Sequence, residues 1–391
     1  MAWIAAPDAL DLLGVKAQTL YANVSRGRIR AKPDPADPRR SLYLRDDVAR
    51  IAASRSGRPR AATIAAGAIQ YGEPVMPSAL CTIVGGRLWY RGIDAIALSR
   101  TATLEDVAAL LWASDAPVTL RVPLPRRRAE TPEDPIAAAM VALAGRAATD
   151  LPTIGRSPAV LRADALDVFA TVVDALVPAA AKETKATDLA DRIAQAWQRP
   201  RARDLIRRAL VVLADHELNA STFAARVAVS TGAALSAGVL SGLCALSGPL
   251  HGRASRPLRG LLEAAARQGA LPAVRAQAAE GRPFAAFGHP LYPGGDPRAA
   301  ALLAHIRVPE AHAQVAAAVE RVAGEAPNID FALSAVTSAH RLPPEAPETL
   351  FAIARCVGWL AHGLEQAALG RIIRPRAHYT GPAVPAQAPA R

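Results

Sequence analysis

The chain combines a high hydrophobic content with very few aromatic residues, and this combination limits the fold more than any other feature. Hydrophobic residues make up 51% of the 391 residues and aromatic residues only 4%, so alanine and other small side chains supply much of the interior. Small side chains pack closely along helices, whereas strands favour β-branched and aromatic residues. The composition therefore predicts an all-α fold with a substantial core, and it excludes a chain that is disordered throughout.

The cysteines, the first residues and one uncharged stretch indicate the cellular compartment of the chain and its relation to membranes. Cys81, Cys244 and Cys356 are odd in number and far apart, which predicts neither a disulfide framework nor a metal site. The first residues lack the pattern of a signal peptide, so we expect a cytoplasmic protein. Residues 227–250 carry no charge, but small residues dominate there, and we interpret them as one buried helix rather than a membrane span.

Positive charge is concentrated near the N-terminus. The formal net charge is +12, and residues 1–60 hold twelve basic against six acidic side chains, which is half of the excess. Apolar spacing predicts helices over residues 6–13 and 17–25, followed by short strands over 29–32 and 41–44 on either side of a turn-rich basic segment. The pattern indicates a separate basic module with two helices and a hairpin.

This segment resembles the winged helix-turn-helix of mercury-resistance-type regulators and excisionase-like modules, through residues 12–15, 19–21, 26–29 and 40–48. The resemblance implies a DNA-binding domain over residues 1–57, with a linker over 58–74. The side chains that would then face the major groove or the phosphates are Gln18, Asn23, Arg26, Arg28, Arg39 and Arg40. A docking module without DNA affinity is the alternative, and the sequence leaves both open.

The rest of the chain lacks the usual signatures of phosphate loops, zinc proteases and serine hydrolases. Histidines in distinctive surroundings remain: His216 in HELNASTF, His251 in GPLHG and His289 in GHPLYPGGDPR, a motif that also holds Arg298. Asp330 lies among apolar residues, which can raise the basicity of a carboxylate. Arg355 lies on an otherwise apolar helix. Each of these residues taken alone also has a purely structural interpretation.

Together, in this order and at this spacing, the motifs resemble the citrate synthase family over residues 75–382. The likeness begins at LWYRG, residues 88–92, and ends with Arg374 and the segment Tyr379-Thr380-Gly381. It implies a helical homodimer with a large domain over residues 75–252 and 341–391 and a small domain over residues 253–340. Oxaloacetate would bind first and close the two domains, and an acyl-CoA would follow.

The resemblance also implies a role for each site residue. Asp330 would take a proton from the acyl-CoA, His251 would donate a hydrogen bond to the enolate oxygen, and His289 would polarise the ketone of oxaloacetate. The substrate carboxylates would be held by His216, Arg298, Arg355 and, across the dimer interface, Arg374. The products would be free CoA and citrate, or methylcitrate from propionyl-CoA, and no metal, redox cofactor or membrane is implied.

The sequence departs from the family pattern at several positions near the predicted site. Pro290 and Pro293 stand where many relatives have basic residues, which removes cations that would lie near the CoA phosphates. Leu213 replaces a second histidine, and Arg253 and Ser255 replace a glycine and an asparagine. These changes and the basic N-terminus motivate an alternative hypothesis, a metabolite-sensing DNA-binding transcriptional regulator built on the same fold.

Overall fold

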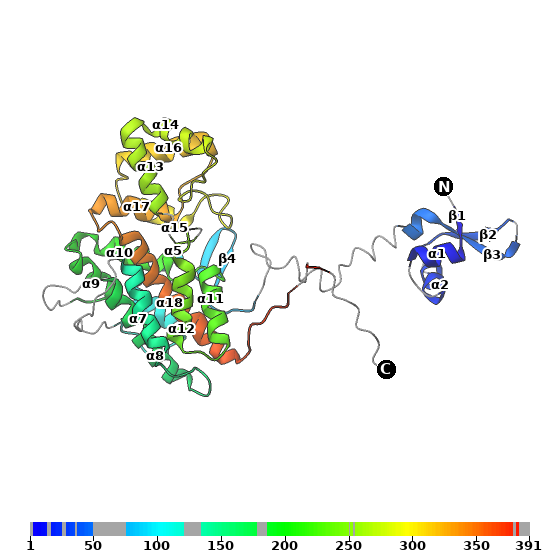
Figure 1. Cartoon of the computed structure of the whole chain (residues 1–391), viewed down its shortest axis with the longest axis horizontal. Helices are drawn as coiled ribbons and strands as arrows, with labels where there is room; N and C mark the ends of the chain where they lie inside the picture. The colour runs from blue at the N-terminus through cyan, green and yellow to red at the C-terminus, as the bar shows by residue number, and fades with distance from the viewer. Residues whose placement is uncertain are drawn as a thin grey trace. The chain divides into compact units, whose positions relative to one another are not determined.

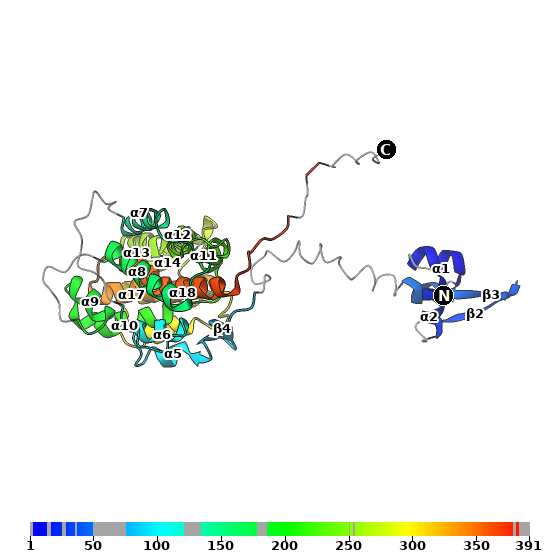
Figure 2. The same ribbon diagram turned by 90° about the horizontal axis from the view of Figure 1, so that it is seen from below.

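The computed structural model describes most of the chain, which divides into two compact units (Figures 1 and 2). The described residues are 3–13, 17–25, 29–35, 37–49, 76–120, 134–177, 186–249, 251–252, 255–377 and 381–382. One unit comprises residues 1–77 with 375–391, and the other comprises residues 78–374.

The N-terminal unit contains the helices α1 and α2, a short helical segment at residues 45–49 and a three-stranded antiparallel sheet. Its elements are β1 (Trp3–Ala5), α1 (Ala6–Leu13), α2 (Ala17–Ser25), β2 (Ala31–Asp34) and β3 (Asp37–Leu44), with sheet order β1-β3-β2. One side of each helix and of the sheet joins a small core made of Ala9, Leu13, Leu20, Ile29, Tyr43 and Val48. Helices α1 and α2 form at the predicted residues. Strand β2 has the predicted length but lies two residues later, and β3 begins four residues earlier than predicted and is longer. The assignment as a winged helix-turn-helix stays a prediction.

The larger unit is helical apart from one small antiparallel sheet, so the all-α prediction is confirmed. The sheet has the order β4 (Cys81–Val84), β5 (Arg87–Tyr90) and β6 (Ile93–Asp94). The helices are α5 (Ala95–Leu98), α6 (Leu104–Leu111), α7 (Pro135–Ala147), α8 (Pro158–Leu176), α9 (Leu189–Ala196), η1 (Pro200–Ala202, a 3-10 turn), α10 (Arg203–Leu213), α11 (Ala220–Ser230), α12 (Leu235–Leu246), α13 (Ser255–Gln268), α14 (Ala270–Ala279), α15 (Pro297–Leu303), α16 (Glu310–Ala323), α17 (Ile329–His340) and α18 (Ala346–Leu369).

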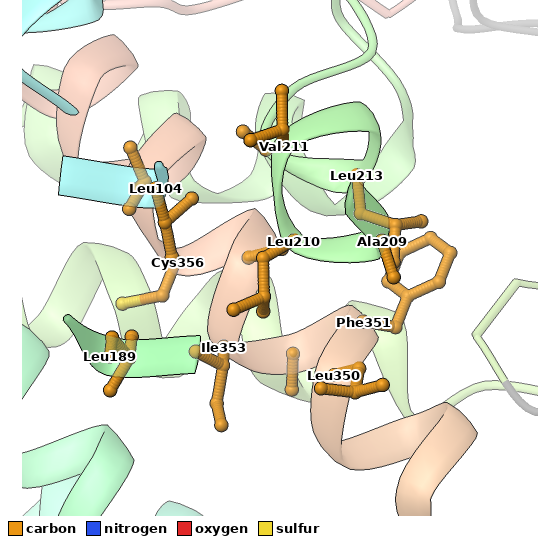
Figure 3. Packing of buried hydrophobic residues seen from close by; sticks show 14 of the residues in the cluster. Leu104, Leu189, Ala209, Leu210, Val211, Leu213, Leu350, Phe351, Ile353 and Cys356 are labelled. Carbon is orange, nitrogen blue, oxygen red and sulfur yellow. The ribbon is translucent and has the colours of Figure 1, made fainter. Parts of the chain in front are cut away.

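Helix α18 runs through the larger of the two hydrophobic cores in this unit. Residues 346–363 of this helix are buried with the exception of Glu348, so the helix is covered on every side over that length. Figure 3 shows Leu350, Ile353 and Cys356 of α18 within the cluster that they share with α9 and α10. Small residues bring the neighbouring helices close, since a Cβ at Gly242 of α12 would lie 2.9 Å from the ring of Trp359.

The uncharged segment 227–250 forms parts of two helices, and the expectation of a single helix is wrong. Helix α11 ends at Ser230 and α12 begins at Leu235. Gly232 lies between them with φ +85°, a conformation that favours glycine, and its N–H bonds to the Val229 carbonyl at 2.8 Å. Hydropathy alone does not reveal this turn. Within the described residues, every helix is too short or too polar to cross a bilayer.

A second, smaller hydrophobic core is built by α13, α14, α16 and one side of α17. Its members include Leu258, Val274, Val319 and Phe331. Helix α17 belongs to both cores, because its Ile329, Ala332, Leu333 and Val336 pack into the larger one. The proposed domain boundaries at residues 253 and 340 stay a prediction, but the second core shows which helices pack with one another.

Candidate active site

Six of the seven side chains that the family resemblance implies lie close together around the start of α15, the start of α17 and the middle of α18. The rings of His216 and His289 are 5.1 Å apart between centroids, in an edge-to-face arrangement. Asp330 interacts electrostatically with Arg298 and Arg355, and His251 interacts with Arg355. Residues up to 139 positions apart in the sequence therefore form one cluster.

His216 is buried in the turn before α11 and is held by a tyrosine. Its Nε2 lies 2.9 Å from the hydroxyl of Tyr292, whose ring also lies 4.9 Å from that of His289. Burial lowers the pKa of His216 well below its usual value, and the charges of Arg298 and Arg355 lower it further. His216 is therefore a neutral imidazole that can offer an N–H to a substrate carboxylate.

The loop that carries His289 is tied to the start of α17 by one asparagine. The Asn328 side chain caps α17 by accepting from the Asp330 N–H, and it donates to the carbonyls of Ala285 and Gly288 at 3.2 and 3.0 Å. His289 Nδ1 accepts from the Leu291 N–H at 3.2 Å, which leaves the ring proton on Nε2. Burial and Arg298 lower the pKa of His289 to about 4, so the ring is a neutral donor.

Asp330 lies in the first turn of α17 and has the properties of a general base. Burial raises its pKa to about 7, even though Arg298 and Arg355 favour the charged form. A carboxyl group with this pKa is a far stronger base than an exposed aspartate, and it is still substantially ionised near neutral pH.

Arg298 and Asp296 form a buried ion pair at the start of α15. Two guanidinium nitrogens of Arg298 bond to the Asp296 carboxylate, Nε at 3.0 Å and Nη2 at 2.8 Å. Burial disfavours both charges, but the pairing raises the pKa of Arg298 and lowers that of Asp296 overall. The Nη1 end of Arg298 is the part left for a substrate. Asp296 Oδ2 also accepts from the Ile329 N–H, which joins α15 to α17.

Arg355 is a buried cation that is only partly satisfied. Its Nε donates to the Leu213 carbonyl at 3.0 Å, whereas its Nη2 is buried without a hydrogen-bond partner in the described part of the chain. Burial lowers the pKa of Arg355, against the attraction of Asp215. An unpaired buried guanidinium is costly unless a ligand anion completes it, so Arg355 is suited to bind a carboxylate.

His251 follows α12 and is held by a hydroxyl group. Its Nε2 lies 2.8 Å from Ser221 Oγ, which donates to Asn219 Oδ1 at 2.7 Å and accepts from Trp359 Nε1 at 3.2 Å. Burial and Arg355 lower the pKa of His251 to about 4, so this ring is also neutral at pH 7.

The remaining residues that the sequence singles out lie at the edge of this cluster, apart from it or outside the described residues. Arg374 is exposed in the extended segment after α18, and Pro290 and Pro293 are exposed beside His289. Leu213 contributes its carbonyl to Arg355, and Ser255 contacts Glu348 at 3.4 Å. Arg253 lies outside the described residues.

The proposed DNA-contacting residues are only partly described. Arg26 and Arg28 lie outside the described residues, as do the side chains of Gln18 and Arg39. Asn23 donates to the Thr19 carbonyl of its own helix at 2.8 Å. Arg40 is 79% exposed and lies 3.3 Å from Asp37.

Several residues of the site did not stand out in the sequence. Tyr292 contacts His216, 76 positions away, and Ser221 contacts His251, 30 positions away. No local sequence pattern predicts such contacts. Asn328 and Asn219 precede helices, so the rule that asparagine favours N-cap positions could have found them. Within the described residues, no three side chains of the metal-binding types come together.

The fold and the site together define a class of protein. It is a helical enzyme in which a basic carboxyl group, three neutral imidazoles and buried guanidinium groups converge, an arrangement suited to carbon-acid chemistry on carboxylate substrates.

Comparison with known proteins identifies the family. Residues 70–376 match the model described as citrate synthase, C-terminal domain. The chain is 33% identical over 329 residues to "Putative citrate synthase 2" of Mycobacterium tuberculosis, covering 76% of this chain and 88% of that protein. It is 38% identical over 186 residues to "Citrate synthase 2" of Bacillus subtilis, covering 45% of this chain and 50% of that protein. The chain belongs to the citrate synthase family.

Solved structures of the family are similar to the chain as well. The Thermotoga maritima citrate synthase has a TM-score of 0.65 and 25% identity, covering 81% of this chain and 96% of that one. The Thermoplasma acidophilum citrate synthase, determined as a ternary complex with carboxymethyl coenzyme A and oxaloacetate, has a TM-score of 0.64 and 25% identity over 81% and 97%. These relatives support an enzyme of the acyltransferase type.

Proposed function

We propose that the chain condenses an acyl-CoA with oxaloacetate, which gives citrate from acetyl-CoA, or methylcitrate from propionyl-CoA, and free CoA. The observation that carries this proposal is the position of Asp330, a carboxyl group with a pKa of about 7, within electrostatic reach of Arg298 and Arg355. The first chemical step needs a base of that strength, and a dicarboxylate needs the cations.

The first step makes the nucleophile. The Asp330 carboxylate removes a proton from the carbon next to the thioester carbonyl, and the negative charge develops on the thioester oxygen as an enolate. His251 stabilises that oxygen with a hydrogen bond from Nδ1–H, because its Nε2 faces Ser221. This role requires the Ser221 hydroxyl to turn from Asn219 to His251 Nε2, since only then does the neutral ring carry its proton on Nδ1.

The second step joins the two substrates. The enolate carbon attacks the ketone carbon of oxaloacetate, a carbon–carbon bond forms, and the ketone oxygen becomes an alkoxide that His289 stabilises. The N–H at His289 Nε2 donates the hydrogen bond to this oxygen, because Nδ1 already accepts from the Leu291 N–H. Water then cleaves the thioester, which releases CoA and the carboxylate product.

Oxaloacetate is held by its carboxylates on both sides of this centre. The unpaired Nη2 of Arg355, the Nη1 end of Arg298 and an N–H of His216 are the donors on one chain. Arg374 of a second subunit is the proposed fourth donor, in a homodimer. Because these donors come from separate elements, namely α15, α18 and the turn before α11, oxaloacetate would draw them together first and complete the site for the acyl-CoA.

An assay of free CoA tests this proposal. Purified protein is incubated with oxaloacetate and either acetyl-CoA or propionyl-CoA, and the released thiol is measured with a chromogenic reagent. We expect release that depends on oxaloacetate with at least one donor, and comparison of kcat/KM identifies the preferred acyl group. No release with either donor would overturn the proposal.

A second candidate function is that of a DNA-binding regulator that senses a carboxylate or an acyl-CoA. The observation that favours it is the N-terminal unit, with helices α1 and α2 and a hairpin, in a part of the chain where residues 1–60 carry half of the excess positive charge. If this unit binds DNA, affinity for duplex DNA should fall steeply with salt and depend on Arg26, Arg28, Arg39 and Arg40. Undetectable or salt-insensitive binding by the full chain would count against this function.

A further inference from the structure

Beside the candidate site, one face of α18 holds the short segment that leads into His216. Arg355, Gly358 and His362 are spaced by three and four residues, so they share this face. Arg355 Nε bonds to the Leu213 carbonyl at 3.0 Å, and His362 Nε2 lies 3.1 Å from Asp215 Oδ2. Between them, a Cβ at Gly358 would lie 2.3 Å from the Ala214 carbonyl oxygen, which shows how closely the segment rests on the helix.

A buried arginine fixes which nitrogen of His362 carries the proton. Arg226 Nη1 lies 3.2 Å from His362 Nδ1, and a guanidinium group can only donate. Nδ1 therefore accepts, and the proton of the neutral ring resides on Nε2, where it is donated to Asp215. All three side chains are at most 1% exposed. Arg226 thus donates to His362, and His362 donates to Asp215.

Arg226 is itself held in place by two further residues of α18. Its Nη1 donates to Glu365 Oε2 at 2.6 Å and its Nε donates to Gln366 Oε1 at 3.1 Å. Glu365 balances the charge of Arg226 locally. The negative charge of Asp215 is therefore left to face the site cation Arg355, and it favours the charged form of that group.

Three buried atoms of this arrangement lack a hydrogen-bond partner within the described residues, and Arg226 Nη2 is one of them. The other two are Asp215 Oδ1 and Arg355 Nη2. If Asp215 lost its bond to His362, this buried carboxylate would pair with the nearest cation. An Arg355 paired with Asp215 in that way would no longer be available to a substrate.

We propose that Asp215 and His362 are positioning residues, which hold Arg355 and His216 in place for a substrate carboxylate, with Arg226 fixing the tautomer of His362. This inference rests on the proposed function, because that function assigns a carboxylate to Arg355 and His216. Neither Asp215 nor His362 touches the reacting atoms, so their effect is on the binding of oxaloacetate rather than on the acyl-CoA.

Substitutions at His362 test the proposal. Glutamine can accept from Arg226 and donate to Asp215 as the neutral histidine does, whereas leucine can do neither. We expect His362→Leu to raise the KM for oxaloacetate by roughly tenfold or more, with the KM for acyl-CoA nearly unchanged, and His362→Gln to stay within about threefold of wild type. His362→Asn is too short to bond both partners, and it provides the same comparison if the leucine variant does not fold.

The control removes a comparable hydrogen bond from the same helix. Trp112 is buried and its Nε1 donates to the Val357 carbonyl at 3.0 Å, so Trp112→Phe should lower the melting temperature without changing the KM for oxaloacetate. Folded Leu and Asn variants with an unchanged KM, or an equal KM change in Trp112→Phe, would overturn the positioning role.

A third measurement does not depend on catalysis. In ¹⁵N-histidine-labelled full-length protein, with His362→Gln used for assignment, we expect His362 in the Nε2–H form and Arg226→Met to disturb that form. A proton on Nδ1 would overturn the proposal even if the enzyme is active. Absence of CoA release and of oxaloacetate binding in the wild type would instead overturn the proposed function, and the inference that rests on it would fall with it.

Discussion

At the scale of single residues, burial drives most ionisable groups of the site toward their neutral forms. It lowers the pKa of the three histidines and raises that of Asp330. The paired Arg298 and Asp296 are the contrast, because each favours the charged form of the other. The site therefore combines neutral hydrogen-bond donors and one strong base with buried guanidinium cations.

The titration of Asp330 predicts the acid limb of the activity. Only the carboxylate can accept a proton, so kcat should fall as the pH decreases through about 7, while His251 and His289, with pKa values of about 4, stay neutral in that window. Asp330→Asn should lower kcat at least about a hundredfold. Steady-state CoA release between pH 5.5 and 9 measures both effects, and an activity that is flat down to pH 5.5 would contradict the role of Asp330 as the base.

The same residue predicts an opposite effect on stability. The folded-state pKa of Asp330 is raised, so its contribution to stability is fully present below the unfolded value of about 4 and is lost as the pH rises through about 7. Asp330→Asn should therefore melt at a higher temperature than wild type at pH 8. Thermal unfolding at pH 5 and pH 8 measures this, and a less stable variant at pH 8 would show that the carboxylate is not strained by burial.

At the scale of elements, the ends of helices rather than their middles deliver most of the site. Asp296, Asn328 and Asn219 cap α15, α17 and α11, and each cap fixes the first turn that holds or follows a site residue. Helix α18 is the exception, because it presents Arg355 from its middle.

Close packing at Gly358 predicts a strong effect from adding one methyl group. A Cβ there would lie 2.3 Å from the Ala214 carbonyl oxygen and 2.8 Å from Asp215 Oδ1, and a backbone carbonyl cannot move aside cheaply. Gly358→Ala should destabilise the protein by about 1–3 kcal/mol and raise the KM for oxaloacetate. The matched control is Gly145→Ala in α7, where a Cβ meets nothing within 4 Å and should stabilise by about 0.5–1 kcal/mol. Denaturant unfolding compares them, and equal effects would refute the close approach.

The sequence was sufficient to predict the helical class and the family, because small residues and the histidine motifs are local features. Six of the seven site residues that it singled out lie close together in the structure, and their roles stay a prediction. The sequence was not sufficient for the partners of those residues. Tyr292 and Ser221 meet His216 and His251 only through the folding of distant segments. Segment 227–250 was mispredicted as a single helix because hydropathy does not register that Gly232 adopts φ +85°.

At the scale of the whole molecule, the exposed Arg374 is the residue that, on the proposed function, would complete the site of a second subunit. The segment that carries it is anchored to the larger unit, since Gln366 Nε2 donates to the Arg371 carbonyl at 2.7 Å and the Ile373 N–H bonds to Ser230 Oγ at 3.0 Å. Arg374 is thus presented outward from a fixed base, as expected of a residue that serves a second subunit.

Subunit mixing tests this sharing of residues. Arg374→Ala and Asp330→Ala homodimers should each be nearly inactive, but a mixed dimer would contain one site with both native residues. We expect activity to reappear after subunit exchange, measured as CoA release alongside native mass spectrometry of the exchanged dimers. Mixed dimers that form and stay inactive would show that Arg374 does not complete the site of a partner.

The double packing of α17 limits how the enzyme can open. Ile329, Leu333 and Val336 are buried in the larger core, while Phe331 and Ala335 of the same helix are buried in the smaller one. Peeling α17 away from the larger core would expose three large aliphatic side chains at about 1.5–3 kcal/mol each. That cost makes such a state rare, so we expect α17 and its Asp330 to stay packed on the larger core. Any movement of the smaller core would then take place around α17, with the base at a nearly constant position while substrates bind and products leave.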